Sequence, residues 1–339
     1  MVLDDALIRL RRTGPERDGW LSNHAPMAVE ALVRHGRQAT VHRWLDTYSA
    51  RLEDRPRGIA RIPAQEWRDP LGDPVRTGDW LTYFEREASL APWRDVLATW
   101  WPRLLPGIAA GATHGVIRVG HAVRALLDEE TPARVAELGD GLAYWAARWQ
   151  PLAPAGRGPY RRTDPRAALD AVPRVPDQRF GIRNRLAQLA HLPDWAEAAG
   201  AVPGEGDPAT RIAAIVAAAV RRHTTHGYGS PVMLVHAATA PAAVLRTLPA
   251  LPPSLHAASL EAAWAASAAV TAAYSPATAS APAPAGSLDP GSVIDNAVTS
   301  GDAHAIKFAD AAVEAWTGTG DPVLLAAGCH ATELISPRA

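Results

Sequence analysis

The length, composition and charge of the chain narrow the classes of protein it can belong to. It has 339 residues and 47% hydrophobic content, which suits a globular protein and argues against wholesale disorder. The 34 basic and 35 acidic residues nearly cancel, so the net charge of −1 argues against a nucleic-acid binder. A single cysteine, Cys329, excludes an internal disulfide framework. We see no signal-peptide core and no strongly apolar run of about 18 residues, and expect a soluble, cytoplasmic protein with no membrane partner.

Helical periodicity dominates the sequence in chain order. A helix capped by Asn23 is expected to stop near Gly36, and a second one begins at Thr40. Further helical patterns cover 84–100, 114–127, 131–149, 179–199, 208–223, 231–247, 255–273, 302–316 and 320–334. The predicted fold class is therefore all-α.

Two proline-rich stretches interrupt the helices. Residues 151–178 read as a long ordered loop or lid, and residues 275–291 as a Pro/Ala/Ser-rich linker. Neither resembles a domain boundary, because too few helices follow the second stretch to bury a core of their own. We therefore predict a single compact multi-helix domain over residues 1–339.

Four histidines lie in segments that favour burial. His114 and His121 are seven residues apart, so a helix brings both to nearly the same face. His24 lies at a helix start beside Asn23, and His236 follows an apolar run. The alternatives are one buried and one surface histidine for the first pair, and structural histidines bonded to backbone carbonyls for the others.

Lys307 is the only lysine among the 34 basic residues. Lysine, unlike arginine, can lose its proton near neutral pH, although drift explains the count equally well. His304 lies three residues before it on the same helix face, among apolar neighbours. Burial lowers the pKa of an amine, and a neutral amine can add carbon dioxide to form a carbamate. The alternative is a lysine whose head reaches solvent. Imidazoles with one carboxylate-like oxygen suit iron, and less specifically zinc, copper or nickel.

Two further features are weaker candidates for binding. Among twelve tryptophans, most of which should anchor the core, Trp100 and Trp101 are candidates for lining a pocket for a flat ligand. His223 and His226 have a spacing that can chelate a metal, but the arginines just before them favour a solvated helix end.

Four segments together resemble one protein family. LSNHAPMAVEAL, ATHGVIRVGHAVRAL, VMLVHAATAPAAVLRTL and DAHAIKFADAA, in this order, are similar to motifs of the questin oxidase-like family, and the resemblance covers residues 18 to 332. It implies an all-helical fold. It also implies a non-haem iron enzyme, since the fungal relatives open a quinone ring of anthraquinones with molecular oxygen, using iron held by histidines and a carboxylated lysine.

The resemblance assigns roles to individual residues. The metal ligands would be His24, His114, His236, His304 and Lys307. The fungal pattern has a histidine four residues after the first of its pair, where this chain has Arg118, so His121 either replaces it as a ligand or has no role. Asn23 and Asp302 would orient the imidazoles, and Trp100 and Trp101 would stack on the substrate.

The expected function is an Fe(2+)-dependent oxygenase acting on an anthraquinone-like polyketide. It would insert oxygen in a Baeyer–Villiger-like reaction or cleave the ring as a dioxygenase, with O2 and the aromatic substrate as its partners. Whether NADPH serves as an external reductant stays open, because no nucleotide-binding signature is present. The alternatives are a metal-free helical binding protein for a hydrophobic metabolite and a zinc hydrolase with the same ligands. The sequence leaves the exact substrate and the oligomeric state open.

Overall fold

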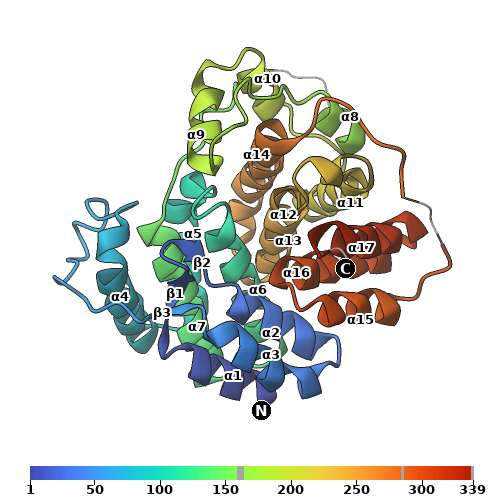
Figure 1. Cartoon of the computed structure of the whole chain (residues 1–339). Coiled ribbons are helices and arrows are strands. Elements are labelled where there is room, and N and C mark those ends of the chain that lie inside the picture. Colours follow the sequence, from blue (N-terminus) through green and yellow to red (C-terminus); the bar gives the residue numbers. More distant parts are fainter. Residues whose placement is uncertain (159–163, 284–285, 337–339) are drawn as a thin grey trace. The chain divides into compact units, whose positions relative to one another are not determined.

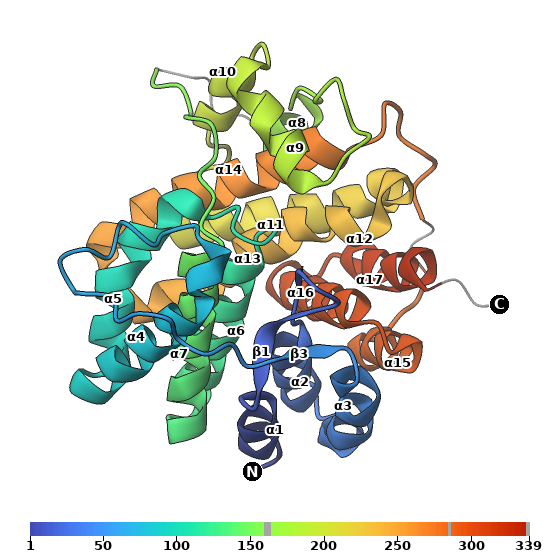
Figure 2. The same ribbon diagram turned by 60° about the vertical axis from the view of Figure 1, so that its left-hand side comes forward.

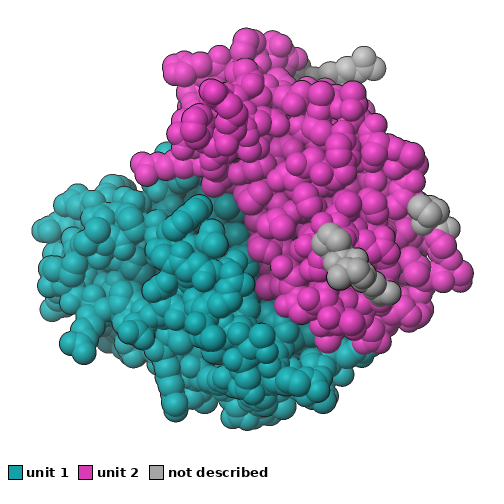
Figure 3. Space-filling model, in the orientation of Figure 1, with its two compact units in different colours: residues 1–151, 246–255 teal, residues 152–245, 256–339 magenta. Residues whose placement is uncertain are grey.

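The fold is mostly helical, as predicted. The computed structural model describes residues 1–158, 164–283 and 286–336, and shows many helices with one small sheet (Figure 1). The chain divides into two compact units, shown in Figure 3: unit 1 comprises residues 1–151 and 246–255, and unit 2 comprises residues 152–245 and 256–339. Two compact units can belong to one folding domain. The single domain predicted over residues 1–339 therefore stays a prediction.

Unit 1 combines seven helices among its described residues with a three-stranded antiparallel sheet of order β2-β1-β3. Its elements are α1 (Val2–Leu10), β1 (Thr13–Arg17), β2 (Leu21–Ser22), α2 (Ala25–Arg34), α3 (Val41–Ser49), β3 (Leu52–Asp54), α4 (Thr77–Leu90), α5 (Trp93–Leu104), α6 (His114–Asp128) and α7 (Pro132–Ala147). Helix α7 packs against both α4 and α6, and α2 packs against α6. Helices α2 and α6 therefore lie next to each other within unit 1.

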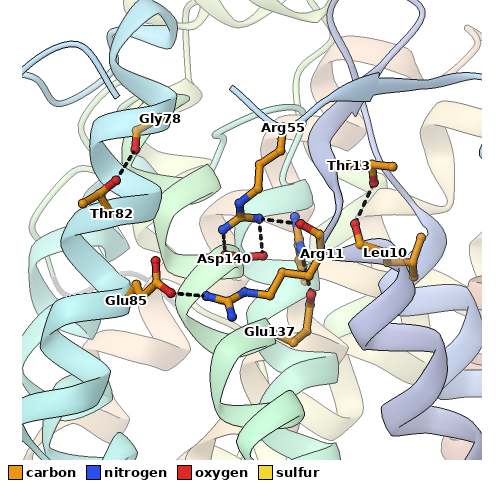
Figure 4. A network of polar contacts seen from close by, with 10 residues as sticks. Leu10, Arg11, Thr13, Arg55, Gly78, Thr82, Glu85, Glu137 and Asp140 are labelled. Carbon is orange, nitrogen blue, oxygen red and sulfur yellow. Dashed lines mark hydrogen bonds and ion pairs between the residues drawn. The ribbon is translucent and has the colours of Figure 1, made fainter. Parts of the chain in front are cut away.

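Polar side chains join the elements of unit 1. Arg55, which follows β3, donates from both terminal nitrogens to the buried carboxylate of Asp140 on α7, each at 2.8 Å (Figure 4). Arg11 donates to Glu85 on α4 at 2.9 Å in a more exposed ion pair. The bidentate geometry and burial of the first pair make it the stronger of the two links.

The described residues of unit 2 form helices joined by loops, with no strand among them. Its elements are α8 (Pro165–Asp170), α9 (Ile182–Ala187), α10 (Trp195–Gly200), α11 (Pro208–His226), α12 (Pro231–Leu234), α13 (His236–Thr247, in this unit as far as Leu245), α14 (His256–Tyr274), α15 (Pro290–Ser300), α16 (Ala303–Thr319) and α17 (Pro322–Ile335). Helices α15, α16 and α17 pack together (Figure 2), and α11 contacts α8, α14, α16 and α17. Aspartates cap several of these helices by accepting hydrogen bonds from backbone N–H groups, among them Asp207, Asp302 and Asp321.

Several predicted boundaries are wrong. The helix predicted over 84–100 is two helices, because α4 ends at Leu90 and α5 begins only after Pro92, whose ring disfavours the helical conformation of the residue before it. The stretch 179–199 contains only the short α9 and α10 with a 3-10 turn between them. Helices α1 and α15 and the three strands are not predicted from the sequence at all.

The two proline-rich stretches are partly described. Within 151–178, helix α8 and the buried side chains of Leu169, Val172 and Val175 pack into unit 2, and the Val175 N–H donates to the carbonyl of Ala272 at 3.0 Å. Residues 159–163 and 284–285 lie outside the described residues. A lid function for 151–178 stays a prediction.

One helical stretch has the length and apolar character of a membrane span, contrary to our reading of the sequence. It runs from Pro231 to Ala250, and a window of 18 residues within it has a mean hydropathy of 1.3 and is 78% buried inside the structure. Such burial is typical of a core helix of a soluble protein, which agrees with the predicted solubility.

Candidate metal centre

Unit 1 brings His24 and His114 together. His24 precedes the first residue of α2, and His114 is the first residue of α6. Their rings stack with centroids 4.5 Å apart and planes 21° from parallel, and one nitrogen of each lies within 4.8 Å of the other. Two nitrogens that bind one ion at about 2.1 Å are at most about 4.2 Å apart, so a small side-chain movement would let this pair bind a common ion.

Asn23 fixes the backbone on both sides of His24. Its side-chain nitrogen donates to the carbonyl of Gly14 at 3.1 Å, and its oxygen accepts from the N–H of Ala25 at 3.0 Å. The N–H of His24 itself donates to the hydroxyl of Tyr48 at 2.9 Å. Asn23 therefore positions His24 through the main chain, and the structure shows no bond from its side chain to an imidazole among the described contacts.

The backbone before His114 is strained. Gly111, Ala112 and Thr113 have φ values of 53°, 58° and 68°, in the left-handed region. For the two residues with side chains this conformation costs about 1 kcal/mol or more each, and such strain clusters at functional sites. A Cβ on Gly111 would lie 2.5 Å from the hydroxyl of Tyr144, so only glycine fits there. The sequence gives no sign of this turn.

Unit 2 brings His236 and His304 together. His236 is the first residue of α13, and His304 lies in the first turn of α16. Their ring centroids are 5.8 Å apart with planes at 82°, an edge-to-face contact. Burial, followed by the charges of Lys307 and His304, lowers the pKa of His236 well below its usual value. His236 is therefore neutral near pH 7, as a metal ligand must be.

Lys307 is the buried lysine that the sequence predicted. It lies one turn after His304 on α16, is 1% exposed, and its amine is buried. The alternative of a head that reaches solvent is thereby wrong. Its charge acts on His236, which places the amine near the two histidines of unit 2. Asp302 accepts from the backbone N–H of His304 at 2.7 Å and lies 3.2 Å from its Nδ1.

Three of the candidate ligands share one hydrogen-bonding pattern. The Nδ1 of His114 lies 2.6 Å from the carbonyl oxygen of Gly111, and that of His236 lies 3.1 Å from the carbonyl oxygen of Met233. In His304 the Nδ1 faces Asp302. An Nδ1–H that donates to a carbonyl or carboxylate places the ring's lone pair on Nε2, which is the arrangement that metal-binding histidines use.

His121 belongs to a different network. Its Nδ1 lies 2.6 Å from Glu30, which also accepts two bonds from Arg124, and its Nε2 lies 3.1 Å from a terminal nitrogen of Arg246. Both ring nitrogens therefore have protein partners and neither is left for an ion. We therefore leave His121 out of the proposed ligands. It lies on the same face of α6 as His114, but its ring is held by Glu30 and Arg246 and does not join the same site.

The two tryptophans predicted to stack on a substrate lie in the core of unit 1. Trp100 has edge-to-face contacts with Trp80, Tyr83 and Phe84, and Trp101 has one with Trp145. Both are completely buried by protein, so neither presents a ring face to a ligand in this structure.

His223 is also buried, which makes the predicted solvated helix end wrong at that residue. It is 2% exposed, its Nε2 lies 3.1 Å from the carbonyl oxygen of Pro231, and its ring contacts Phe308. Burial lowers its pKa to about 4.

No protein-family model and no curated protein matches this chain. The chemistry of the residues must therefore carry the functional argument. Buried imidazoles with anchored Nδ1 atoms suit a borderline transition-metal ion such as Fe²⁺ or Zn²⁺, and a carbamate on Lys307 would add an oxygen donor.

Proposed function

We propose that this chain is a non-haem iron(II) oxygenase of aromatic polyketide metabolism, as the four motifs similar to the questin oxidase-like family imply. The observation that best supports a metal enzyme is the shared pattern of His114, His236 and His304. Each is buried near a helix start, with Nδ1 facing a carbonyl or carboxylate oxygen.

The proposed ligands are His24 and His114 from unit 1 and His236, His304 and Lys307 from unit 2. Gly111 and Met233 hold two of the rings through their carbonyls, and Asp302 holds the third. Bound Fe²⁺ would supply the activation of O2. The buried surroundings keep His236 neutral, because burial disfavours its protonated form.

Lys307 would contribute as a carbamate. A neutral amine adds CO2 to form a nitrogen–carbon bond and releases one proton, which leaves a carboxylate-like group on the side chain. Burial favours the neutral amine that this addition needs, and arginine forms no such group. The predicted substrate is an anthraquinone-like polyketide, and the predicted location is the cytoplasm. A requirement for NADPH is decided by assaying O2 consumption with and without it.

Metal content tests the proposal. Untagged protein should carry about one iron per chain, and His114→Ala and His304→Ala should each remove it completely if one ion is held by both groups, as the resemblance implies. His42→Ala in unit 1 and His191→Ala in unit 2 change exposed histidines and should leave the iron in place. Two independent sites would instead lose only part of the metal in each variant.

The remaining outcomes separate the alternatives. Metal-free protein with normal helical content supports a binding protein for a hydrophobic metabolite. Zinc without O2 consumption supports a hydrolase. Iron together with O2 consumption on an anthraquinone supports the oxygenase.

The carbamate has a test of its own. Lys307→Met removes the amine at similar volume and should abolish metal binding, whereas Lys307→Glu supplies a carboxylate and should retain part of it. The cobalt-substituted protein reports the ligand set by its visible absorption spectrum. Labelled bicarbonate should give a carbamate carbon signal in NMR that Lys307→Met lacks, and equal signals in both proteins would contradict the assignment.

A further inference from the structure

A cavity of about 620 Å³ lies within unit 2, and none of the proposed metal ligands lines it, although His226 does. It is formed by α8, the second half of α11, the start of α17 and the segment 279–283. This volume falls within the range of roughly 300–1,000 Å³ that small-molecule sites occupy. The predicted linker is therefore, in its described part, one wall of a cavity.

Three arginines line this cavity, with fewer acids to balance them. Arg221 forms an ion pair with Asp321, and Arg222 forms one with Asp170. Arg166 also lines the cavity, and no ion pair of its side chain is seen among the described residues. The cavity thus carries a positive charge beyond that of its acids.

The arginines are held at an electrostatic cost. Burial lowers the pKa of Arg222 to about 10, and its Nε is a buried donor for which the described residues offer no acceptor. Burial and the nearby charge of Arg166 lower the pKa of Arg221. An anion in the cavity would relieve this repulsion and accept bonds from the guanidinium groups, which match carboxylate and phosphate oxygens in geometry.

The rest of the lining combines polar residues (Thr224, Thr225 and His226) with apolar ones. Leu169, Ala218 and Val323 contribute apolar surface. The 279–283 wall is tied to α11 because the N–H and hydroxyl of Ser280 both donate to the carbonyl of Thr225, at 2.8 and 3.0 Å. The cavity is open to solvent on one side, where Arg166 and Ala279 are exposed, and its lining includes both charged and apolar side chains.

We propose that this cavity binds a small organic anion, whose carboxylate or phosphate group lies against Arg166, Arg221 and Arg222 and whose apolar body lies against Leu169 and Val323. This site is independent of the proposed oxygenase function.

Calorimetric titration with benzoate and phenyl phosphate tests the proposal, with benzyl alcohol as a neutral probe of similar shape. At least one anion should bind saturably at millimolar or lower concentration, and the tighter of the two identifies the charged group. Arg166→Gln should weaken that binding about tenfold, because a charge-assisted contact is lost. Arg183→Gln, which removes an exposed arginine on α9, should leave the affinity unchanged.

A steric variant guards against charge effects at a distance. Ala279→Trp fills the cavity from its exposed wall and should abolish binding, whereas Ala277→Trp, which does not line it, should have no effect. Iron content should be the same in all variants, so this test and that of the metal site fail separately. Absence of saturable binding, equal binding of benzyl alcohol, or equal effects of Arg166→Gln and Arg183→Gln would overturn the proposal.

Discussion

His121 offers a quantitative test of the buried network in unit 1. The perturbation is His121→Gln, because a glutamine amide can donate to Glu30 and accept from Arg246 but cannot titrate. The charged groups that face His121 are Glu30 from α2, Arg124 from α6 itself and Arg246 from the 246–255 segment. The variant thus keeps the hydrogen bonds and removes the protonation step.

The expected magnitude follows from the pKa of His121. Burial and the charge of Arg246 lower it from 6.5 to about 4, against the opposite effect of Glu30. Between these values the unfolded chain binds a proton that the folded chain does not, so the stabilising contribution is present above pH 6.5 and lost as the pH falls towards 4. At about 1.4 kcal/mol per pH unit, the loss from this group approaches 3 kcal/mol.

Denaturant unfolding of the metal-free protein at several pH values between 7 and 4.5 measures how the stability of each protein depends on pH. The wild-type chain should lose about 2–3 kcal/mol more stability on acidification than His121→Gln. At pH 7 the variant should be destabilised by about 1 kcal/mol and should bind metal normally. Identical pH dependence in the two proteins would refute the buried neutral histidine, and loss of metal from the variant would make His121 a ligand after all.

Two further substitutions, each with a control variant, test the geometry of unit 1. Gly111→Ala combines a φ of 53° with a clash against the Tyr144 hydroxyl, and should lower the free energy of unfolding by about 2–3 kcal/mol and weaken metal binding through His114. Gly36→Ala has a φ of 72° and open space around its Cβ, so it should cost only about 1 kcal/mol, and equal losses would contradict the clash. Arg55→Met leaves the buried Asp140 carboxylate without its bidentate partner and should cost about 3 kcal/mol in chemical denaturation. Arg11→Met breaks a more exposed pair and should cost under about 1 kcal/mol, so a similar loss in both would show that burial does not strengthen the first pair.

Local patterns predicted the long helices well because their signals lie within a few residues. Helix α11 begins at the Asp207 cap, and α14 and α16 follow their periodic segments closely. Strand β1, whose sequence is TGPER, contains glycine and proline and shows no alternation of apolar residues. Its partners β2 and β3 define it through pairing across the chain, and single-segment propensity carries no information on such pairing.

In the candidate site too, features set by neighbouring residues were predictable, and features set by contacts with distant segments were not. Burial of His236 and Lys307 was predictable from their apolar neighbours in the sequence. The assignment of His121 was not, because Glu30 and Arg246 come from distant segments and their contacts with the ring decide its role. For Trp100 the cause is likewise distant, since Trp80, on the separate helix α4, covers its ring.

The burial of Lys307 changes what can be inferred from its being the only lysine in the sequence. At an exposed position, an arginine-rich sequence would tolerate arginine, so the survival of one lysine there would be a chemical signal. At 1% exposure Lys307 fills a closed space that the larger planar guanidinium would not fit without displacing its neighbours. Size alone therefore explains why arginine is absent at this position, and the count adds little to the case for a carbamate. The stronger argument is electrostatic: the positive charge of Lys307 acts on the buried His236, and conversion of the amine to an anionic carbamate would replace that charge by one that attracts a bound cation.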